Sequence, residues 1–460
     1  MITLYNSLSR EKESFPDQKK IRLFVCGPTV YDYLHIGNAR TYIFFDFFAK
    51  YLRARGYDVT YLQNITDIDD KIIARAMTDG KETTAVAQFF TEAYFEDMKA
   101  LGVDAVTTYA PATKFISQIV AQVERLIDKG FAYKIDSDGW YFDISKDADY
   151  GKLSGRTAAQ AEDGVTRIDE SVGKRNKGDF CLWKFSQTSL KNLEPRWPSS
   201  LGEGRPGWHI EDTAISEFYF GPQYEIHGAS VDLKFPHHEA EIAQQESASG
   251  KKPFVQIWMH TGALLVEGKK MSKSVGNFIT IRNFLNDHPA IILRWLVLSH
   301  HYRSPFDYSE RALTQAMAEL ENLYTLSLQA REEKRNNAED ASRTDMLSWK
   351  KQFDDALDDD LNTPKAIAII FDMFKDKTLT AAAKATLMET FDEILGLNIA
   401  QTLSQTEAIP AKVMEKFAEY QGLRSNKQFI QSDALRKEIE GLGYVVRDAA
   451  DGSFITKRFF

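Results

Sequence analysis

The chain has 460 residues, enough for two to four domains, and its apolar and charged fractions of 43% and 27% are typical of a globular protein. Only two cysteines occur, Cys26 and Cys181, which excludes a disulfide framework and suits a reducing cytoplasm. A net charge of −9 argues against general coating of nucleic acid, although a local basic patch can still hold a polyanion. The most apolar stretch, TYIFFDFFAKYL, carries Asp46 and Lys50 and is too short to span a bilayer, so we expect no export and no membrane span.

The first 65 residues predict a strand, a helix and a second strand. The run IRLFVC, from Ile21 to Cys26, is typical of a buried strand, and apolar residues follow helical spacing from Asn38 to about Arg55. Gly56 ends this helix, and DVTYLQNI predicts the second strand. Strand, helix and strand in this order form the unit of a doubly wound parallel sheet. The predicted class is therefore α/β, with a Rossmann-like sheet.

Changes in composition predict four further regions. Short segments rich in Gly, Asp, Lys and Pro indicate an insertion outside the sheet, and helical periodicity begins near Tyr308. The last fifty residues predict two helices and two strands, with nine Lys or Arg against seven Asp or Glu in residues 408–460. We assign 1–131 and 205–250 to the Rossmann-like domain, 132–204 to a connective insertion, 251–307 to a region carrying a KMSKS loop, 308–400 to a helix bundle and 408–460 to a small mixed α/β module.

The segment GPTVYDYLHIGNAR follows the first strand and places His35, Gly37 and Asn38 at the start of the helix. Backbone N–H groups at a helix N-terminus point at an anion, and a glycine there lets a nucleotide approach closely. His35 can donate to phosphate oxygens. Taken alone, the tripeptide HIG is better explained as an ordinary loop.

The run PHHEAEIA at 236–243 gathers two histidines and two acids. If it is helical, His237 and Glu241 lie on one face, at a spacing that allows both to bind one metal ion. A solvated helix cap is the alternative, because Pro236 suits the first helical position and acids near a helix N-terminus are favoured. The metalloprotease pattern HExxH is not completed, since Ile242 stands at the second histidine.

Lys270 and Lys273 lie in a glycine-flanked loop, EGKKMSKSVGN. Two lysines on such a loop can close over a triphosphate and offset the charge that develops as pyrophosphate leaves. A Lys/Ser loop alone is usually a solvated turn. Its occurrence together with HIGN, in this order and more than two hundred residues later, is not explained by chance.

The pair HIGN and KMSKS resembles the signature of class I aminoacyl-tRNA synthetases. Other segments resemble cysteinyl-tRNA synthetases over essentially the whole chain, including VCGPTVYD, NITDIDDKI, GRPGWHIE, FPHHEAEIAQ and HYRSPFDYS. DDDLNTPKAI and SDALRKEIEGLGYVVRDAADGS resemble the helical and anticodon-binding domains of that family. The resemblance implies an enzyme that activates L-cysteine with ATP and Mg²⁺ and transfers it to tRNA(Cys). We expect a cytoplasmic monomer.

The resemblance also implies roles for individual residues. One Zn²⁺ would bind the thiolate of substrate cysteine, and its ligands would be Cys26, Asp212, His237 and Glu241. The amino acid would contact Thr66, Trp208 and His227, with Asp232 beside its ammonium group. The catalytic residues would be His35, Asn38, Lys270 and Lys273, and ATP would contact His35, Gly37, Asn38 and Lys273.

The sequence departs from the family at two of these positions. The first tetrapeptide ends in Asn38 and not in histidine, but an amide also donates hydrogen bonds to phosphate. Asp212 replaces the usual cysteine, which puts the metal site in question. Aspartate is a normal zinc ligand with the same charge as a thiolate, so we predict that zinc still binds. The alternative is that Asp212 only caps a helix at DTAISEF.

Two other functions are compatible with the same motifs. One is a ligase that joins cysteine to a small amine, as in mycothiol-pathway relatives, although those lack a terminal anticodon module. The other is a catalytically silent paralogue, which we would expect to have lost His35, Lys270 and Lys273. Basic residues of the last module are candidates for phosphate contact, namely Arg424, Lys427, Arg436, Lys437, Arg447, Lys457 and Arg458.

Overall fold

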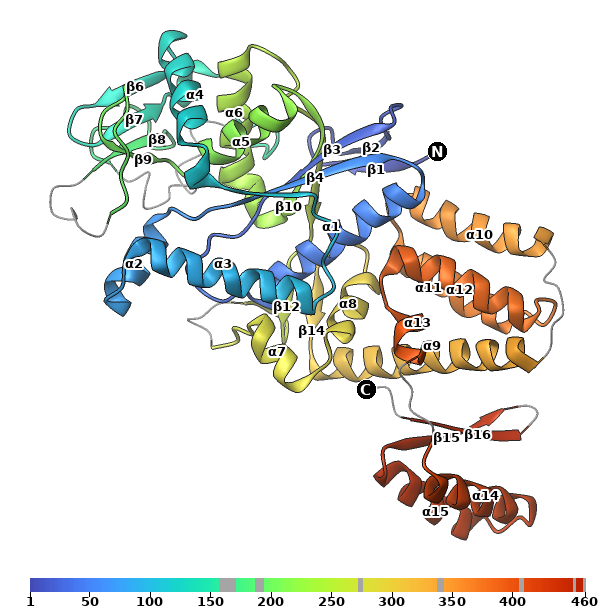
Figure 1. Cartoon of the computed structure of the whole chain (residues 1–460). Coiled ribbons are helices and arrows are strands. Elements are labelled where there is room, and N and C mark those ends of the chain that lie inside the picture. Colours follow the sequence, from blue (N-terminus) through green and yellow to red (C-terminus); the bar gives the residue numbers. More distant parts are fainter. Residues whose placement is uncertain are drawn as a thin grey trace. The chain divides into compact units, whose positions relative to one another are not determined.

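A computed structural model describes residues 1–156, 171–186, 194–271, 276–336, 343–404, 409–449 and 452–457. The chain divides into two compact units (Figure 1). Unit 1 consists of Met1–Ser309 and Asp354–Lys365, and unit 2 of Glu310–Phe353 and Ala366–Phe460. Within the described ranges, no helix combines the length and the apolar character needed to cross a membrane.

Unit 1 is built on a five-stranded parallel sheet, which confirms the predicted α/β class. The strand order is β11-β10-β3-β4-β5, so the order reverses between β3 and β10. Ligand sites of open α/β sheets lie at the carboxyl ends of the strands where the order reverses. The strands are β3 (Lys20–Val25), β4 (Asp58–Ile65), β5 (Thr108–Pro111), β10 (Tyr224–Ser230) and β11 (Val255–Thr261).

Helix α1 (Ile36–Ala54) is the central helix of this sheet and contacts β4, β10 and β11. Fourteen of its 19 residues are buried, because α8 (Ala290–Leu298) covers another side of it. A helix covered on several sides carries apolar residues on several faces, which explains the run YIFFDFF. Helices α2 (Asp70–Asp79) and α3 (Thr83–Ala100) follow β4, and α7 (Ile281–Asp287) precedes α8.

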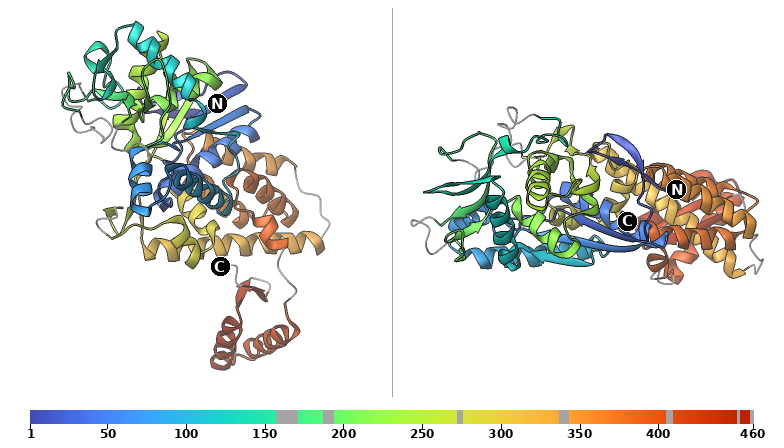
Figure 2. Two further views of the ribbon diagram at one scale, coloured as in Figure 1. Left: turned by 60° about the vertical axis from the view of Figure 1, so that its left-hand side comes forward. Right: turned by 90° about the horizontal axis from the view of Figure 1, so that it is seen from above.

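The region predicted as an insertion contains an antiparallel sheet, β6-β7-β8-β9. Its core is shared with three helices, and Figures 1 and 2 show this sheet and the helices grouped together in each view. This shared core fixes the two helices that carry the predicted ligands Asp212 and Glu241. The elements are β6 (Ala132–Ile135), β7 (Gly139–Phe142), β8 (Phe180–Phe185), β9 (Gly204–Pro206), α4 (Ile116–Asp128), α5 (Ile210–Phe220) and α6 (Glu239–Ser249).

Two smaller sheets complete unit 1. Strands β1 (Thr3–Asn6) and β2 (Glu11–Ser14) form an antiparallel pair. In the other sheet β12 pairs with both β13 and β14, and β13 leads directly into the KMSKS loop. The strands of this sheet are β12 (Leu264–Val266), β13 (Lys269–Lys270) and β14 (Phe306–Tyr308).

Unit 2 contains the predicted bundle and the terminal module. The module has a hydrophobic core of its own, whose members all lie between residues 409 and 455. The bundle helices are α9 (Glu310–Asn336), α10 (Arg343–Asp358), α11 (Thr363–Lys375), α12 (Ala381–Leu395) and α13 (Ile399–Ser404). The module consists of α14 (Ala411–Ser425), α15 (Phe429–Gly441), β15 (Tyr444–Ala449) and β16 (Gly452–Lys457).

The segment Asp354–Lys365 belongs to unit 1, although it falls inside the predicted bundle at 308–400. Two carboxylates of the sequence DDDLNTP explain this. Asp358 accepts a hydrogen bond from Arg55 at 2.6 Å, and the fully buried Asp360 accepts from Tyr302 and Arg303 at 2.8 Å each. Charge-assisted hydrogen bonds of this kind are stronger than neutral ones, so they hold the segment to unit 1. The other predicted domain boundaries stay predictions.

Asp46 and Arg294 form a buried ion pair between α1 and α8. The N–O distance is 2.7 Å and both side chains are at most 1% exposed. Asp46 also lies 2.9 Å from Lys50 and accepts the backbone N–H groups of Asp104 and Ala105 at 2.9 Å. Burial alone would raise the pKa of Asp46, but Arg294 and Lys50 together lower it below its ordinary value. The carboxylate is therefore charged at neutral pH and stabilises the α1–α8 contact.

We expect Asp46→Asn to lower the stability of unit 1 by about 3 kcal/mol or more at pH 7, because Arg294 loses its buried counter-charge. The pKa of Asp46 is depressed in the folded state, so its contribution is present above the unfolded pKa of about 3.9 and is lost as pH falls below it. The difference between parent and variant should therefore shrink below about pH 4. Thermal unfolding followed by tryptophan fluorescence measures this, since six of the seven tryptophans lie in unit 1.

Asp104→Asn is the matched control, because Asp104 is 76% exposed and pairs with the same Lys50. We expect this variant to unfold like the parent. Equal destabilisation by the two substitutions would contradict the assignment.

Candidate active site and metal centre

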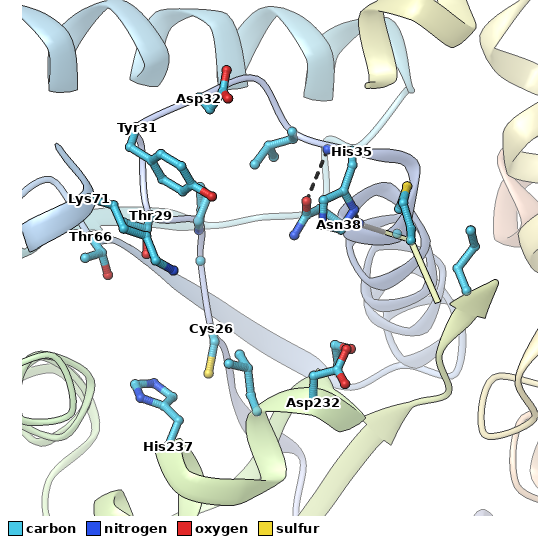
Figure 3. A pocket seen from close by; sticks show the side chains of 18 of the residues that line it. Cys26, Thr29, Tyr31, Asp32, His35, Asn38, Thr66, Lys71, Asp232 and His237 are labelled. Carbon is cyan, nitrogen blue, oxygen red and sulfur yellow. Dashed lines mark hydrogen bonds between the residues drawn. The ribbon is translucent and has the colours of Figure 1, made fainter. Parts of the chain in front are cut away.

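A cavity of about 410 Å³ lies at the carboxyl ends of β3 and β10, where the strand order reverses. Figure 3 shows that it has two ends. His35 and Asn38 lie at one end, at the start of α1, and Cys26 and His237 lie at the other. The motifs HIGN and PHHEAEIA therefore contribute to one site, although two hundred residues separate them.

His35 and Asn38 form a reciprocal cap at the N-terminus of α1. The Asn38 backbone N–H donates to Nδ1 of His35 at 3.2 Å, and the His35 backbone N–H donates to Oδ1 of Asn38 at 3.2 Å. Because Nδ1 of His35 accepts, its proton is on Nε2, which makes Nε2–H a donor. The Asn38 amide likewise keeps Nδ2 as a donor. The cap thus orients two donor groups beside the helix N-terminus, where an anion is favoured.

The segment after the KMSKS loop is hydrogen-bonded to this cap. The Ile36 N–H donates to Ile279 O at 3.1 Å, and the Ile281 N–H donates to Leu34 O at 2.8 Å. Gly37 allows this close packing, since a Cβ there would lie 2.8 Å from Nδ1 of His35 and 3.3 Å from the Met271 side chain. The two signature motifs are therefore in contact. Lys273 lies outside the described residues, so its predicted role stays a prediction.

At the other end, four side chains bring together a set of possible metal ligands. One ligand atom from each of Cys26, Asp212, His237 and Glu241 lies within 4.8 Å of the others, and all four residues are buried. Nε2 of His237 is 3.1 Å from Oδ2 of Asp212 and 3.1 Å from Oε1 of Glu241. Cys26 follows β3, Asp212 comes from α5, His237 precedes α6 and Glu241 lies within it. This is the set of residues that the sequence predicts.

The electrostatics of this set favour a bound cation. Burial and the nearby Asp212 charge raise the pKa of Glu241, and burial together with Glu241 and Asp212 raises the pKa of Cys26. Among the described residues, neither carboxylate oxygen of Glu241 has a hydrogen-bond partner of acceptable geometry. Thiolate, imidazole and carboxylate are the donors that Zn²⁺ takes in proteins, usually four at once. The residues therefore fit one zinc ion.

Both cap interpretations are wrong. The solvated-cap interpretation of PHHEAEIA fails because His237 and Glu241 are 2% and 0% exposed. Asp212 does not cap α5, since the N-cap residue is His209 and the helix has no side-chain cap bond. The Asp212 carboxylate instead faces Asn64 and His237.

Further histidines lie behind Cys26. Nε2 of His227 is 3.3 Å from the Cys26 sulfur and Nε2 of His238 is 3.1 Å from it, while Nδ1 of His238 is 2.9 Å from Nε2 of His260. Burial lowers the pKa of all three imidazoles, so they are neutral near pH 7. His227 and His238 complete a second possible metal-binding set with Cys26 and Glu241. His227 was predicted to contact the amino acid, but it does not line the cavity, because β10 turns it behind Cys26.

Comparison with known proteins identifies the family. Residues 13–318 match the model described as "tRNA synthetases class I (C) catalytic domain", and residues 352–400 match the DALR domain. A protein of Hahella chejuensis named "Cysteine--tRNA ligase" is 42% identical, over 98% of this chain and 99% of its own length. Proteins of the same name from Clostridioides difficile and Thermococcus onnurineus are each 40% identical over 98% of this chain and 99% and 98% of their own lengths. The chain belongs to the cysteine–tRNA ligase family.

Solved structures of more distant proteins share the fold. The Mycobacterium tuberculosis methionyl-tRNA synthetase in complex with methionyl-adenylate superposes with a TM-score of 0.58 at 16% identity, covering 84% of this chain and 91% of that one. LeuRS of Agrobacterium radiobacter K84, in a ternary complex with tRNA, gives a TM-score of 0.59 at 12% identity, with 84% and 85% covered. At these identities the likeness concerns the fold alone.

Within this family member, Thr66 and Trp208 line the cavity, and their contacts with the amino acid stay predictions. Trp208 stacks on His237 with ring centroids 4.4 Å apart, and the Thr66 hydroxyl donates to Glu211 at 2.9 Å. Burial and the neighbouring Asp212 raise the pKa of Glu211. Sequence reasoning missed Glu211, whose position beside Asp212 in GWHIEDTAI was the available signal.

Asp232 and Lys270 also line the cavity, and they pair with each other at 3.0 Å. The residue predicted to meet the substrate ammonium and one of the lysines predicted to meet the phosphates therefore offset each other's charge. Their side chains are exposed, so this pair is weak and easily exchanged for other partners.

We expect the purified parent to contain one divalent metal ion per chain and Glu241→Gln to contain much less, because the substitution removes an anionic donor from a buried site. Elemental analysis after purification without chelator measures this. Glu246→Gln is the matched control, since Glu246 lies on the same helix, is buried and pairs with Lys152 outside the cluster. A parent free of metal, or full metal in Glu241→Gln, would contradict the assignment.

Proposed function

We propose that the chain activates L-cysteine with ATP and Mg²⁺ and transfers the cysteinyl group to tRNA(Cys). The observation that carries this proposal is one cavity with the helix cap of His35 and Asn38 at one end and the buried candidate metal ligands, including Cys26 and His237, at the other. ATP suits the first end and a thiol-bearing amino acid suits the second. The name that the near full-length relatives share supports this assignment.

At the phosphate end, the residues act on charge. The N-terminus of α1, the Nε2–H of His35 and the Nδ2–H groups of Asn38 would donate to phosphate oxygens. Lys270 and Lys273 would offset the charge that builds up on pyrophosphate as the adenylate forms. When Lys270 turns to the phosphates, Asp232 loses its partner and can accept the ammonium group of cysteine. ATP would thus take Lys270 as its partner and cysteine would take Asp232, in place of the ion pair that these two side chains form with each other.

At the other end, the residues would select the sulfur atom. A pocket that relies on packing separates near-isosteres such as cysteine and serine by only about 1–3 kcal/mol. A zinc ion held by Cys26, Asp212, His237 and Glu241 would supply a soft Lewis acid that prefers a thiolate to a hydroxyl. Trp208 would hold the His237 ring in place by stacking, and Thr66 would bound the space beside it.

We expect the purified protein to exchange pyrophosphate into ATP only when cysteine is supplied, and serine to support almost no exchange. His35→Ala should lower the exchange rate about 10²-fold or more, because it removes a donor to the developing charge. His288→Ala, which changes a histidine that does not line the cavity, should leave the rate unchanged. Equal exchange with serine would refute the proposal.

The terminal module would bind tRNA. Because its core is self-contained, ending the chain after residue 408 should spare cysteine-dependent exchange but strongly reduce charging of tRNA. The contribution of the module to tRNA affinity should weaken as salt rises, because phosphate contacts release counterions. A truncated protein that charges tRNA as well as the full chain would contradict this role, and one that joins cysteine only to a small amine would favour the alternative ligase.

The described basic side chains of the module differ in their availability. Lys427 and Lys437 are exposed, whereas Arg436 donates to Val446 O at 2.9 Å and lies 3.4 Å from Glu440. Lys427 and Lys437 are therefore the better phosphate contacts. The side chains of Arg447, Lys457 and Arg458 lie outside the described part of the chain.

A further inference from the structure

Asn64 lies at the end of β4 and contacts two of the four elements that carry the candidate ligands. Its side chain is 2% exposed. Nδ2 of Asn64 donates to Oδ1 of Asp212 at 2.6 Å, and Oδ1 of Asn64 accepts the backbone N–H of Gly27 at 2.6 Å. Gly27 directly follows Cys26. One buried amide therefore joins the main chain beside Cys26 to the side chain of Asp212.

The chemistry of its neighbours fixes the orientation of this amide. A backbone N–H can only donate, so the oxygen of Asn64 must face Gly27. With the oxygen facing Gly27, the nitrogen faces Asp212 and donates to its Oδ1. The second Nδ2 hydrogen is directed at the Thr66 hydroxyl oxygen, 3.4 Å away. The contact with Gly27 is also tight, because a Cβ on Gly27 would lie 1.7 Å from the backbone oxygen of Asn64. The side chain has little freedom to turn.

The two oxygens of Asp212 are consequently divided between two tasks. Oδ1 receives the Asn64 hydrogen bond, and Oδ2 lies 3.1 Å from Nε2 of His237, inside the candidate ligand set. A free carboxylate can rotate and offer either oxygen or both, whereas this one presents a single oxygen. A neutral donor suits this task, because a lysine or arginine in the same place would repel a bound cation.

We propose that Asn64 is the positioning residue that allows an aspartate to serve as a metal ligand at position 212. The proposal rests on the metal site proposed above and deepens it. A thiolate offers one sulfur atom and has no second donor atom to restrain, so a cysteine at position 212 would depend less on Asn64. The hydrogen bond from the Gly27 N–H to Asn64 does not involve position 212, so it is the same with aspartate or cysteine there.

This difference defines a double-mutant cycle on the full-length protein. The four proteins are the parent, Asn64→Ala, Asp212→Cys and the double variant, and the measured quantity is Zn²⁺ affinity by competition with a chelator. In the parent background Asn64→Ala should weaken Zn²⁺ binding about 10- to 100-fold, the usual effect of removing a residue that orients a ligand. In the Asp212→Cys background the loss should be only a few-fold. The Gly27 contact is lost in both backgrounds and cancels.

Co²⁺ in place of Zn²⁺ gives a second readout, since its visible absorption depends on the geometry of the ligands. Asn64→Ala should change this spectrum in the parent background more than in the Asp212→Cys background. Asn64→Leu, which keeps the volume of the side chain, repeats the test if the alanine variant folds poorly. The control is Gln63→Ala, because Gln63 is a buried amide on the opposite face of the same strand and bonds to Tyr94, away from the cluster. We expect this variant to bind Zn²⁺ like the parent.

An equal loss of Zn²⁺ affinity in both backgrounds would overturn the proposal, because Asn64 would then act only through Gly27 and Cys26. An unchanged affinity in the parent background would overturn it as well. If the parent itself binds no Zn²⁺, the proposed metal site is refuted and the role of Asn64 is refuted with it. In the other two outcomes the parent binds Zn²⁺, so only the role of Asn64 is refuted.

Discussion

A buried cluster of acidic side chains at the edge of the parallel sheet is the constraint on which the rest of the site depends. A thiol and two carboxyl groups, from Cys26, Asp212 and Glu241, gather around one imidazole with almost no contact with water. Burial and mutual repulsion raise the pKa of Cys26 and Glu241, so the anionic donors do not tolerate one another without a cation. A bound cation would favour the ionised forms of these groups and offset their mutual repulsion.

The fold meets this constraint with two cores. The central sheet positions Cys26 at the end of β3, and the core shared by β6, β7 and β8 with α4, α5 and α6 positions Asp212 and Glu241. The insertion therefore contributes to the site, because its packing sets the distance between α5 and α6, the helices that supply Asp212 and Glu241. The cap at His35 and the strand-like pairing at Ile279 and Ile281 fix the opposite end of the cavity in a similar way.

Local patterns in the sequence were sufficient for the elements and the main motifs. The predicted strand DVTYLQNI is β4, Asp58–Ile65, and the helix predicted from Asn38 to about Arg55 is α1 with an earlier start.

The metal-binding set came from a family resemblance, and the structure brings its members together. The position of His227 behind Cys26 could not be predicted, because the direction of a side chain depends on the twist and register of β10, and its contact with the amino acid stays a prediction. Asn64, His238 and His260 were missed because their roles depend on partners far away in the sequence, such as Asp212 and Ser7. The assignment of Asp354–Lys365 to unit 1 was not predicted for the same reason, since Asp358 bonds to Arg55, 303 positions earlier in the chain.

The family resemblance implies a cysteine at position 212, and an aspartate in its place would change the softness of the donor set more than its charge. Both side chains carry one negative charge, so the electrostatic sum is unchanged. A carboxylate is a harder donor than a thiolate, and the hydrogen bond from Asn64 draws electron density away from it further. Cys26 is then the only sulfur donor among the four candidate ligands. A metal ion in this environment would be a stronger Lewis acid than one with two cysteine ligands, and the thiolate of the substrate would be the second sulfur that it meets and not the third. With Asp212 as the proposed ligand, the contrast between a thiolate and a hydroxyl should therefore be preserved or increased, and with it the selection of cysteine over serine.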